Sequence, residues 1–456
     1  MSNVIEQPRY TCALGAQQTV LAIKRAIPII HAGPGCSSKM FGSLARHSGY
    51  QGTGYAGGTA IPCTNTSEKE VVFGGDDRLR GVIDGAVKVM DADLFAVLTG
   101  CTADIVGDDV GYVTSEYRRN GVSIVNAETG GFKASNYVGH ELVMEAIINQ
   151  FIGDRVPKVQ KGLVNVFSPV PFQNPFWSGD LDGLKLLLES LGLTANILFG
   201  YDTEGVKDWQ RIPDAEFNLL ASPWVGLSTV KLLEDKYGTP YFHYPTLPIG
   251  AEETSKFLRA VGNFAGVEQA KVEEIIKKEE SIFYDYFDRA ADFFTEYPGA
   301  IPRRFELISD SLYGLGFGSY LINELGLIPE SVFVTDDPPE EHHAFIKEAF
   351  AMISGDFTIN TIIENDGGKI ESMIKSKKRK IRDTLLLGSS WDVNLADDIK
   401  AFLFEISTPI SSQLIINGSY VGYKGGLRLM EDIYTMIMKS ENVLRLMERD
   451  ISVFID

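Results

Sequence analysis

The sequence has few cysteines, fewer basic than acidic residues and no long apolar run, and each shortage excludes a class of protein. Only four cysteines occur in 456 residues, too few for a disulfide framework. Cysteines beside glycines in a reducing compartment more often serve metal binding or catalysis. The 61 acidic residues outnumber the 42 basic ones, and the formal net charge is −19. This balance argues against nucleic acid as the main partner, because a phosphate backbone binds cationic surfaces.

Signals for membranes and for nucleotide hydrolysis are missing as well. The sequence contains no run of about 18 or more apolar residues, which a membrane-spanning helix would need. Its first residues, MSNVIEQPRYTC, lack the basic and apolar regions of a signal peptide. We therefore expect a cytoplasmic protein with no membrane partner. A GxxxxGK(S/T) motif is also absent, so we do not expect this chain to hydrolyse ATP itself.

Short β-rich segments alternate with amphipathic helical segments along the whole chain, a pattern typical of α/β domains with mainly parallel sheets. Residues 93–100 predict a buried strand, which follows a helix with apolar residues at spacings of three and four. Further strands are predicted at 165–173, 195–200, 217–222, 240–245, 304–311, 332–337 and 383–390. A long charged helical connection is predicted at 266–297 and a closing helix at 427–438.

A chain of this length can bury several cores. We expect three Rossmann-like, doubly wound α/β lobes with parallel sheets. The first lobe, residues 1–155, carries the cysteines, the middle lobe spans residues 156–298, and residues 299–456 form the last lobe with the closing helix.

Three of the cysteines stand in glycine-rich turns. Cys12 lies in TCALGAQ, Cys36 in HAGPGC and Cys101 in LTGCTADIVGDD, and two of these turns end a predicted strand. Open α/β sheets gather ligands at the carboxyl ends of their strands, and glycine lets the backbone approach a bulky inorganic cluster. Inert core cysteines are the alternative, but they have no reason to stand so consistently in glycine turns. Three thiolates are one short of a cubane's usual four, so a partner must complete the site.

Other polar residues near these turns have two interpretations each. Cys63, in IPCTNTSEKE, is either a fourth ligand or a bystander near the cluster. His31 is either a ligand or a histidine at the end of a strand, bonded to the backbone. Asp108 and Asp109 suggest an acid pair, but adjacent residues point in different directions, which favours capping of a helix after Gly107.

Two further groups carry weaker signals. The GLGFGS stretch at 314–319 follows a predicted strand, but its spacing is not the GxGxxG of a dinucleotide loop. Lys39, Arg46 and His47 are expected to be surface or interface groups rather than acid–base catalysts.

Four motifs in the first part of the chain resemble the N-terminal domain of nitrogenase component 1 subunits. They are TC(x)2GAQ, HxGxGC, EKEVVFGG and C(x)5GDD, in that order over residues 11–109. The segment VGYKGGLRLMEDI, at 421–433, resembles the matching segment of the β chains. The resemblance implies that Cys12, Cys36 and Cys101 match the three cysteines that each subunit gives to the P-cluster, an eight-iron, seven-sulfur relay at the α/β interface. Cys63 matches no such ligand.

The same resemblance indicates a β-type subunit. In the α subunits, the active-site metal cofactor is bound by a cysteine in the middle third of the chain and by a histidine near its end. This chain has no cysteine after Cys101, and its last histidines, His342 and His343, lie in the acidic stretch PPEEHHAF. The substrate-reducing metal cofactor is therefore expected in the partner chain, and we assign no catalytic residue to this one.

The chain also departs from the β pattern. Nitrogenase β chains place a serine, an auxiliary cluster ligand, in a TPSF segment where this sequence reads TGGF with Gly131, and EKEVVFGG is closer to the α and scaffold chains. These departures widen the resemblance to nitrogenase-like relatives: methylthio-alkane reductases, cofactor-assembly scaffolds and dark-operative protochlorophyllide reductases.

The resemblance implies an oxidoreductase that works as an α2β2 heterotetramer. An ATP-dependent iron protein would dock transiently and pass electrons through the shared iron–sulfur cluster to the metal cofactor of the α subunit. The substrate would be dinitrogen or an organic sulfur compound such as a methylthio-alkane. A non-catalytic scaffold for cofactor assembly and a protochlorophyllide-reductase-like subunit are the alternatives.

Overall fold

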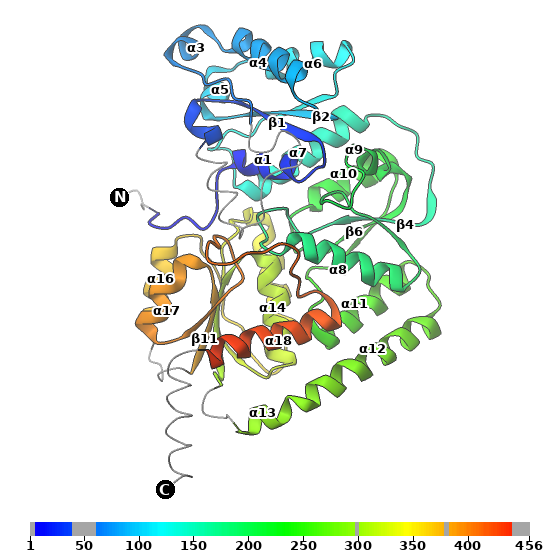
Figure 1. Cartoon of the computed structure of the whole chain (residues 1–456), viewed down its shortest axis with the longest axis vertical. Helices are drawn as coiled ribbons and strands as arrows, with labels where there is room; N and C mark the ends of the chain where they lie inside the picture. Colours follow the sequence, from blue (N-terminus) through cyan, green and yellow to red (C-terminus); the bar gives the residue numbers. More distant parts are fainter. Residues whose placement is uncertain (1–4, 39–60, 297–300, 378–382, 440–456) are drawn as a thin grey trace. The chain divides into compact units, whose positions relative to one another are not determined.

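The computed structural model of the chain describes residues 5–38, 61–296, 301–377 and 383–439 (Figure 1). Helices alternate with the strands of three parallel sheets, which confirms the predicted α/β class. The described residues within 8–245 and 409–418 form one compact unit, and the remaining described residues form another. In the described part, no helix is both long enough and apolar enough to cross a membrane.

The first sheet has the order β1-β2-β3, and its strands are all parallel. The strands are β1 (Ala26–His31), β2 (Leu94–Thr99) and β3 (Ile124–Ala127). Its helical elements are η1 (Ala13–Ala16), α1 (Gln17–Leu21), α3 (Glu68–Phe73), α4 (Asp76–Val89), α5 (Cys101–Val106), α6 (Val110–Arg119), α7 (Asn136–Ile147) and the π-helix η2 (Ile148–Ile152). Apolar residues of β1, β2, α4 and α6 share one buried core, so these helices cover the sheet as their apolar spacing predicts.

The second sheet has the order β5-β4-β6-β7 and is also parallel. Its strands are β4 (Gln160–Phe167), β5 (Thr194–Asn196), β6 (Ala215–Leu220) and β7 (Tyr241–His243), and its helices are α8 (Trp177–Ser190), α9 (Val206–Gln210), the 3-10 helix η3 (Ile212–Asp214) and α10 (Leu227–Tyr237). Three buried asparagines face one another across neighbouring strands. Asn196 donates to Asn165 at 2.7 Å, and Asn165 donates to Asn218 at 2.8 Å. This ladder joins β5, β4 and β6.

The third sheet has the order β10-β9-β8-β11-β12. Its first strand lies in the middle and the chain adds strands to either side, so the sheet is doubly wound. The strands are β8 (Arg304–Ser309), β9 (Ile328–Val334), β10 (Thr361–Ile363), β11 (Thr384–Gly388) and β12 (Phe402–Glu405). The helices are α11 (Gly250–Phe264), α12 (Gln269–Arg289), α13 (Ala291–Glu296), α14 (Ser311–Asn323), η4 (Glu340–His342), α15 (His343–Ala351), α16 (Gly367–Lys375), η5 (Ser390–Asp392), α17 (Val393–Ile399) and α18 (Gly422–Met438). Helices α16 and α17 pack together against one face of this sheet (Figure 1).

The glycine-rich stretch 314–319 lies inside helix α14 and forms no loop. A Cβ on Gly314 would lie 2.9 Å from the Phe350 ring, and one on Gly316 would lie 3.2 Å from the carbonyl oxygen of Leu247. These glycines therefore let the helix pack closely against its neighbours. Their backbone is held in the helix, so the stretch is not a dinucleotide-binding loop.

The strands of the three sheets lie within residues 26–127, 160–243 and 304–405. One sheet thus falls within each of the three predicted lobes. The limits of the lobes, at 155/156 and 298/299, stay a prediction.

Candidate cluster-binding site

Cys36 and Cys101 follow neighbouring parallel strands and lie at the same edge of the first sheet. His31, the last residue of β1, pairs with Thr99, the last residue of β2. Cys36 lies in a helical turn at 34–38, and Cys101 is the first residue of α5. The Gly100 N–H donates to the carbonyl oxygen of His31 at 3.0 Å. A Cβ on Gly100 would lie 3.8 Å from the Cys36 sulfur, so the two cysteine loops are packed directly together.

Cys12 lies near the same edge of the sheet, next to the segment that follows β3. It precedes η1 and forms an antiparallel bridge with Ser135, which lies beyond the carboxyl end of β3. A Cβ placed on Gly131 would lie 3.1 Å from the sulfur of Cys12 and also 3.1 Å from the sulfur of Cys101. These two sulfurs are therefore separated by at most twice that distance. The structure thus brings the loops of Cys12, Cys36 and Cys101 together.

The protein surroundings disfavour thiolates when no cation is present. Burial raises the pKa of Cys12, and the neighbouring Cys101 raises it further. Burial also raises the pKa of Cys36, and the charges of Cys12, Cys101 and Cys63 add to that effect. Thiolate ligands in such a site need a positively charged metal group, whose binding releases the thiol protons.

The donor set fits a multi-iron cluster better than a single ion. Thiolates on one tetrahedral zinc ion lie about 3.8 Å apart, as Zn–S bonds of about 2.3 Å require. Among the described residues, no three histidine, cysteine, aspartate or glutamate side chains are grouped to hold one ion. The thiols of Cys12 and Cys101 instead lie beside Gly131 and that of Cys36 lies beside Gly100, and three soft ligands on separate loops suit an iron–sulfur cluster. Cys12, Cys36 and Cys101 are the residues that would hold it.

Cys63 lies against Ala32 and Gly33, at the start of the loop that carries Cys36. The backbone of Cys63 forms a parallel bridge with Ile30 at the free edge of β1. The Cys63 thiol is within 3.5 Å of the Ala32 carbonyl oxygen, and it accepts from the Asn65 N–H at 3.4 Å. These contacts hold the side chain against backbone. Its role as ligand or bystander stays a prediction.

His31 is bound by two side chains and not by the backbone, so the prediction of a backbone partner was wrong. Its Nε2 lies 2.9 Å from Asp108, and its Nδ1 lies 3.1 Å from the Thr64 hydroxyl. Burial lowers the pKa of His31, which keeps the ring neutral, although Asp108 opposes this effect. Both ring nitrogens are thus engaged away from the cysteines, which argues against His31 as a ligand.

The two adjacent aspartates have separate roles. Asp109 is the N-cap of α6 and accepts from the Tyr112 N–H at 2.8 Å, which confirms the capping prediction. Asp108 accepts from the Gly75 N–H at 2.8 Å with one oxygen and bonds to His31 with the other. It therefore ties the start of α4 to the end of β1. Asp108 and Asp109 form no shared acid pair.

The loop at 128–133 is fixed to the end of β2 and to α5. Thr129 donates through its hydroxyl to the Thr99 carbonyl and through its N–H to the Thr99 hydroxyl, both at 2.9 Å. Asp104 accepts from the Gly130 N–H at 3.1 Å and pairs with Lys133 at 2.9 Å. The sequence analysis did not predict these residues. Only the position of Thr99 at a strand end beside Cys101 could have suggested a role near the site.

Several large apolar side chains are exposed on α3, on α5 and beside Gly131. Phe73 is 82% exposed, Val72 71%, Ile105 74% and Phe132 61%, and Cys101 is exposed as well. Helices α3 and α5 contact each other. An exposed apolar surface of this kind is typical of a protein–protein interface. Lys39, Arg46 and His47 lie outside the described residues.

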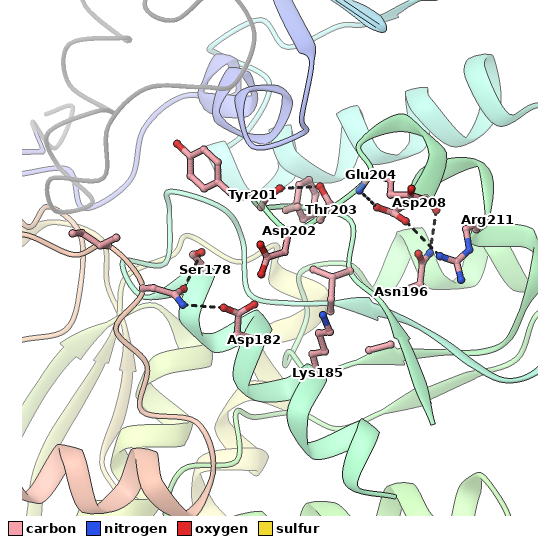
Figure 2. A pocket seen from close by; sticks show the side chains of 16 residues that line it. Ser178, Asp182, Lys185, Asn196, Tyr201, Asp202, Thr203, Glu204, Asp208 and Arg211 are labelled. Atoms are coloured by element: carbon pink, nitrogen blue, oxygen red, sulfur yellow. Dashed lines mark hydrogen bonds and ion pairs between the residues drawn. The ribbon is translucent and has the colours of Figure 1, made fainter. Parts of the chain in front are cut away.

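A pocket lies beside β5 and is not part of the cysteine site (Figure 2). It encloses about 390 Å³, and its lining includes Asp182, Asp208 and Arg211 but no cysteine or histidine. Asn417 donates to Asp182 at 2.9 Å, and Arg211 lies 3.6 Å from Asp208. The two carboxylates thus have protein partners. Nothing in this pocket offers the soft ligands of an iron–sulfur cluster.

Residues 11–438 match the family model described as Nitrogenase component 1 type Oxidoreductase. The chain belongs to this family. It is 24% identical to the nitrogenase molybdenum-iron protein beta chain of Methanococcus maripaludis over 475 aligned positions, covering 96% of this chain and 95% of that protein. It is 23% identical to the nitrogenase vanadium-iron protein beta chain of Trichormus variabilis, covering 92% and 90%.

Two further similarities concern a scaffold protein and a solved structure. The chain is 27% identical to the nitrogenase iron-molybdenum cofactor biosynthesis protein NifE of Methanococcus maripaludis, over 58% of this chain and 53% of that protein. The solved structure "Nitrogenase Cp1 at pH 6.5" superimposes with a TM-score of 0.79 at 22% identity, covering 96% of this chain and 94% of that one. At this identity, the structural likeness shows the fold alone.

Proposed function

We propose that the chain is the β-type subunit of a nitrogenase-like component 1 reductase. It binds half of an interfacial P-type iron–sulfur cluster through Cys12, Cys36 and Cys101, and a homologous α-type subunit supplies the other half. Electrons arrive from an ATP-dependent iron protein and pass to a metal cofactor in the α-type subunit, where a small molecule is reduced. Dinitrogen and organic sulfur compounds such as methylthio-alkanes are the substrate classes.

The convergence of three cysteine loops at one sheet edge carries this proposal. The three cysteines are far apart in the sequence, yet the sulfurs of Cys12 and Cys101 both lie beside Gly131, and the sulfur of Cys36 lies beside Gly100. Three soft ligands in one chain leave an iron–sulfur cluster incomplete, which favours an interface with a second chain. The full-length similarity to nitrogenase beta chains supports the same assignment.

The residues of this chain hold and orient the proposed cluster. When bound, such a cluster stores and releases electrons at a potential set by its ligands, its hydrogen bonds and its exposure. Cys12, Cys36 and Cys101 would anchor it as thiolates. The Asp108–His31 pair and the Thr99–Thr129 pair hold the loops around the cysteines in place, so the ligands are preorganised before the cluster binds.

The exposed apolar residues around Cys101 support a partner at this edge. Val72 and Phe73 end α3, and Ile105 lies on the neighbouring α5. Covering them would remove apolar surface from water, which stabilises a complex. We propose that the α-type subunit and the docking iron protein share this surface, and that the assembly is an α2β2 heterotetramer.

The test is anaerobic purification of the complex with its α-type partner, in the wild type and in two cysteine variants. Cys101→Ala should lose cluster iron, because thiolates anchor the cluster. Cys63→Ala is the matched control, since its sulfur is held against backbone, and it should keep the iron. Equal retention of iron by the two variants would contradict the proposal.

A scaffold for cofactor assembly is the second candidate, and the similarity to NifE over more than half of the chain favours it. The two functions differ in turnover. A reductase consumes substrate when it is supplied with its iron protein and ATP. A scaffold consumes none and instead transfers its metal cofactor to an apo-enzyme.

A further inference from the structure

The backbone of Gly131 lies between two of the cluster cysteines. A Cβ on this residue would lie 3.1 Å from each of the sulfurs of Cys12 and Cys101, and 3.0 Å from the Cβ of Cys12. Such distances are shorter than ordinary van der Waals contacts of about 3.5–4.0 Å. Gly131 is not among the glycines with positive φ. An alanine could therefore adopt its backbone conformation, and steric crowding alone would oppose a side chain here.

The loop cannot easily move away from the cysteines. Thr129, two residues before Gly131, is fully buried and makes two hydrogen bonds with Thr99. Gly130 donates to Asp104 of α5, and Lys133 pairs with the same carboxylate. The loop is therefore fixed on both sides of Gly131. A side chain at this position would displace the cysteines and not the loop.

We infer that Gly131 is a positioning residue, whose bare backbone sets the separation of the Cys12 and Cys101 thiolates on the cluster. This inference rests on the proposed function. It follows that residue 131 offers the cluster no side-chain ligand, and that any side chain there weakens cluster binding by pushing a thiolate out of place.

The effect of a side chain depends on whether the cluster is bound. In the cluster-free chain, the sulfurs of Cys12 and Cys101 can rotate away from an added methyl group. Only the 3.0 Å contact with the Cβ of Cys12 then remains, and a small backbone shift relieves it. Once the cluster holds both sulfurs, they cannot turn away. A positioning role thus predicts weaker cluster retention with unchanged folding of the cluster-free chain, whereas a merely structural glycine would alter folding in both states.

The experiment compares Gly131→Ala, Gly131→Ser and the control Gly85→Ala in the complex with the α-type partner. Gly85 lies in α4, also lacks a positive φ, and a Cβ there would meet nothing within 4 Å. The measurements are iron per complex during challenge with an iron chelator, the electron paramagnetic resonance spectrum of the oxidised cluster, and thermal unfolding of the cluster-free chain.

We expect both Gly131 variants to lose iron to the chelator roughly tenfold faster than the wild type, in line with other changes beside metal ligands. Their cluster spectra should change, and the unfolding temperatures of their cluster-free chains should fall by no more than a few degrees. Gly85→Ala should match the wild type in iron and in spectrum, and its unfolding temperature should be equal or slightly higher, because alanine is favoured over glycine inside a helix. Unchanged iron and spectrum in Gly131→Ala would overturn the inference, and so would lost folding of the cluster-free variant. Retention of iron by Gly131→Ser but not by Gly131→Ala would also overturn it, because the hydroxyl would then be a ligand. A wild-type complex that holds no iron would refute the proposed function itself.

Discussion

Replacing Asp108 by alanine should destabilise the chain far more than the same change at its neighbour Asp109. The Asp108 side chain is 5% exposed, and each of its oxygens accepts from a different buried group: the Gly75 N–H and the His31 ring. A buried donor left without its partner costs about 1–3 kcal/mol. Two such donors give a loss of about 2–6 kcal/mol in the free energy of unfolding. Asp109→Ala removes one exposed helix cap, which costs about 1 kcal/mol.

Urea unfolding of both variants, followed by far-ultraviolet circular dichroism, measures this difference. The Asp108→Ala midpoint should fall well below that of Asp109→Ala. Because Asp108 joins the residues before Cys36 to those after Cys101, its variant should also retain less cluster iron. Equal midpoints for the two variants would refute the role assigned to the His31–Asp108 pair.

Three further results are expected. Cys101→Ala should keep the helical content of the wild type in circular dichroism while iron analysis shows a depleted cluster, because the thiolate is a ligand and not a core residue. Burial raises the pKa of Glu141 from 4.5 to about 7, so its proton is held more tightly in the folded state. The contribution of Glu141 to the free energy of unfolding therefore falls as the pH rises from 4.5 to about 7. Glu141→Gln should remove this pH dependence, which amounts to about 2–3 kcal/mol in the free energy of unfolding between pH 4.5 and about 7. Asn165→Leu should lower the urea midpoint by an amount equivalent to about 2–4 kcal/mol, because it breaks the asparagine ladder and leaves buried polar groups unpaired.

The parts of the fold that depend on nearby residues could be predicted from the sequence. Strand β2 lies at 94–99, within the predicted 93–100, and α4 has the apolar face that its spacing indicates. Asp109 caps the helix that begins one residue later. These features follow from local hydrophobic patterning and from a side chain bonding to backbone three residues away.

Features that depend on distant residues could not be predicted in this way. The partner of His31 is Asp108, 77 residues further along the chain, and no local pattern indicates that pairing. The closeness of Gly131 to two sulfurs depends on three segments far apart in the sequence: the one before η1, the end of β2 and the loop after β3. In the sequence, the glycines of 314–319 show only a weak resemblance to a dinucleotide loop, and their close packing inside α14 depends on residues elsewhere in the chain. The cysteines stood out because glycine turns at strand ends are a local signal, whereas the residues that hold their loops lie elsewhere in the sequence.

Iron counting on the complex of this chain with its α-type partner, purified anaerobically, tests the central claim most directly. The account predicts about eight irons per αβ pair for the shared cluster, in addition to those of a substrate-reducing cofactor. About four irons per pair would indicate a simple cubane, as in scaffold or protochlorophyllide-type relatives, and would contradict the assignment to substrate reduction at a metal cofactor.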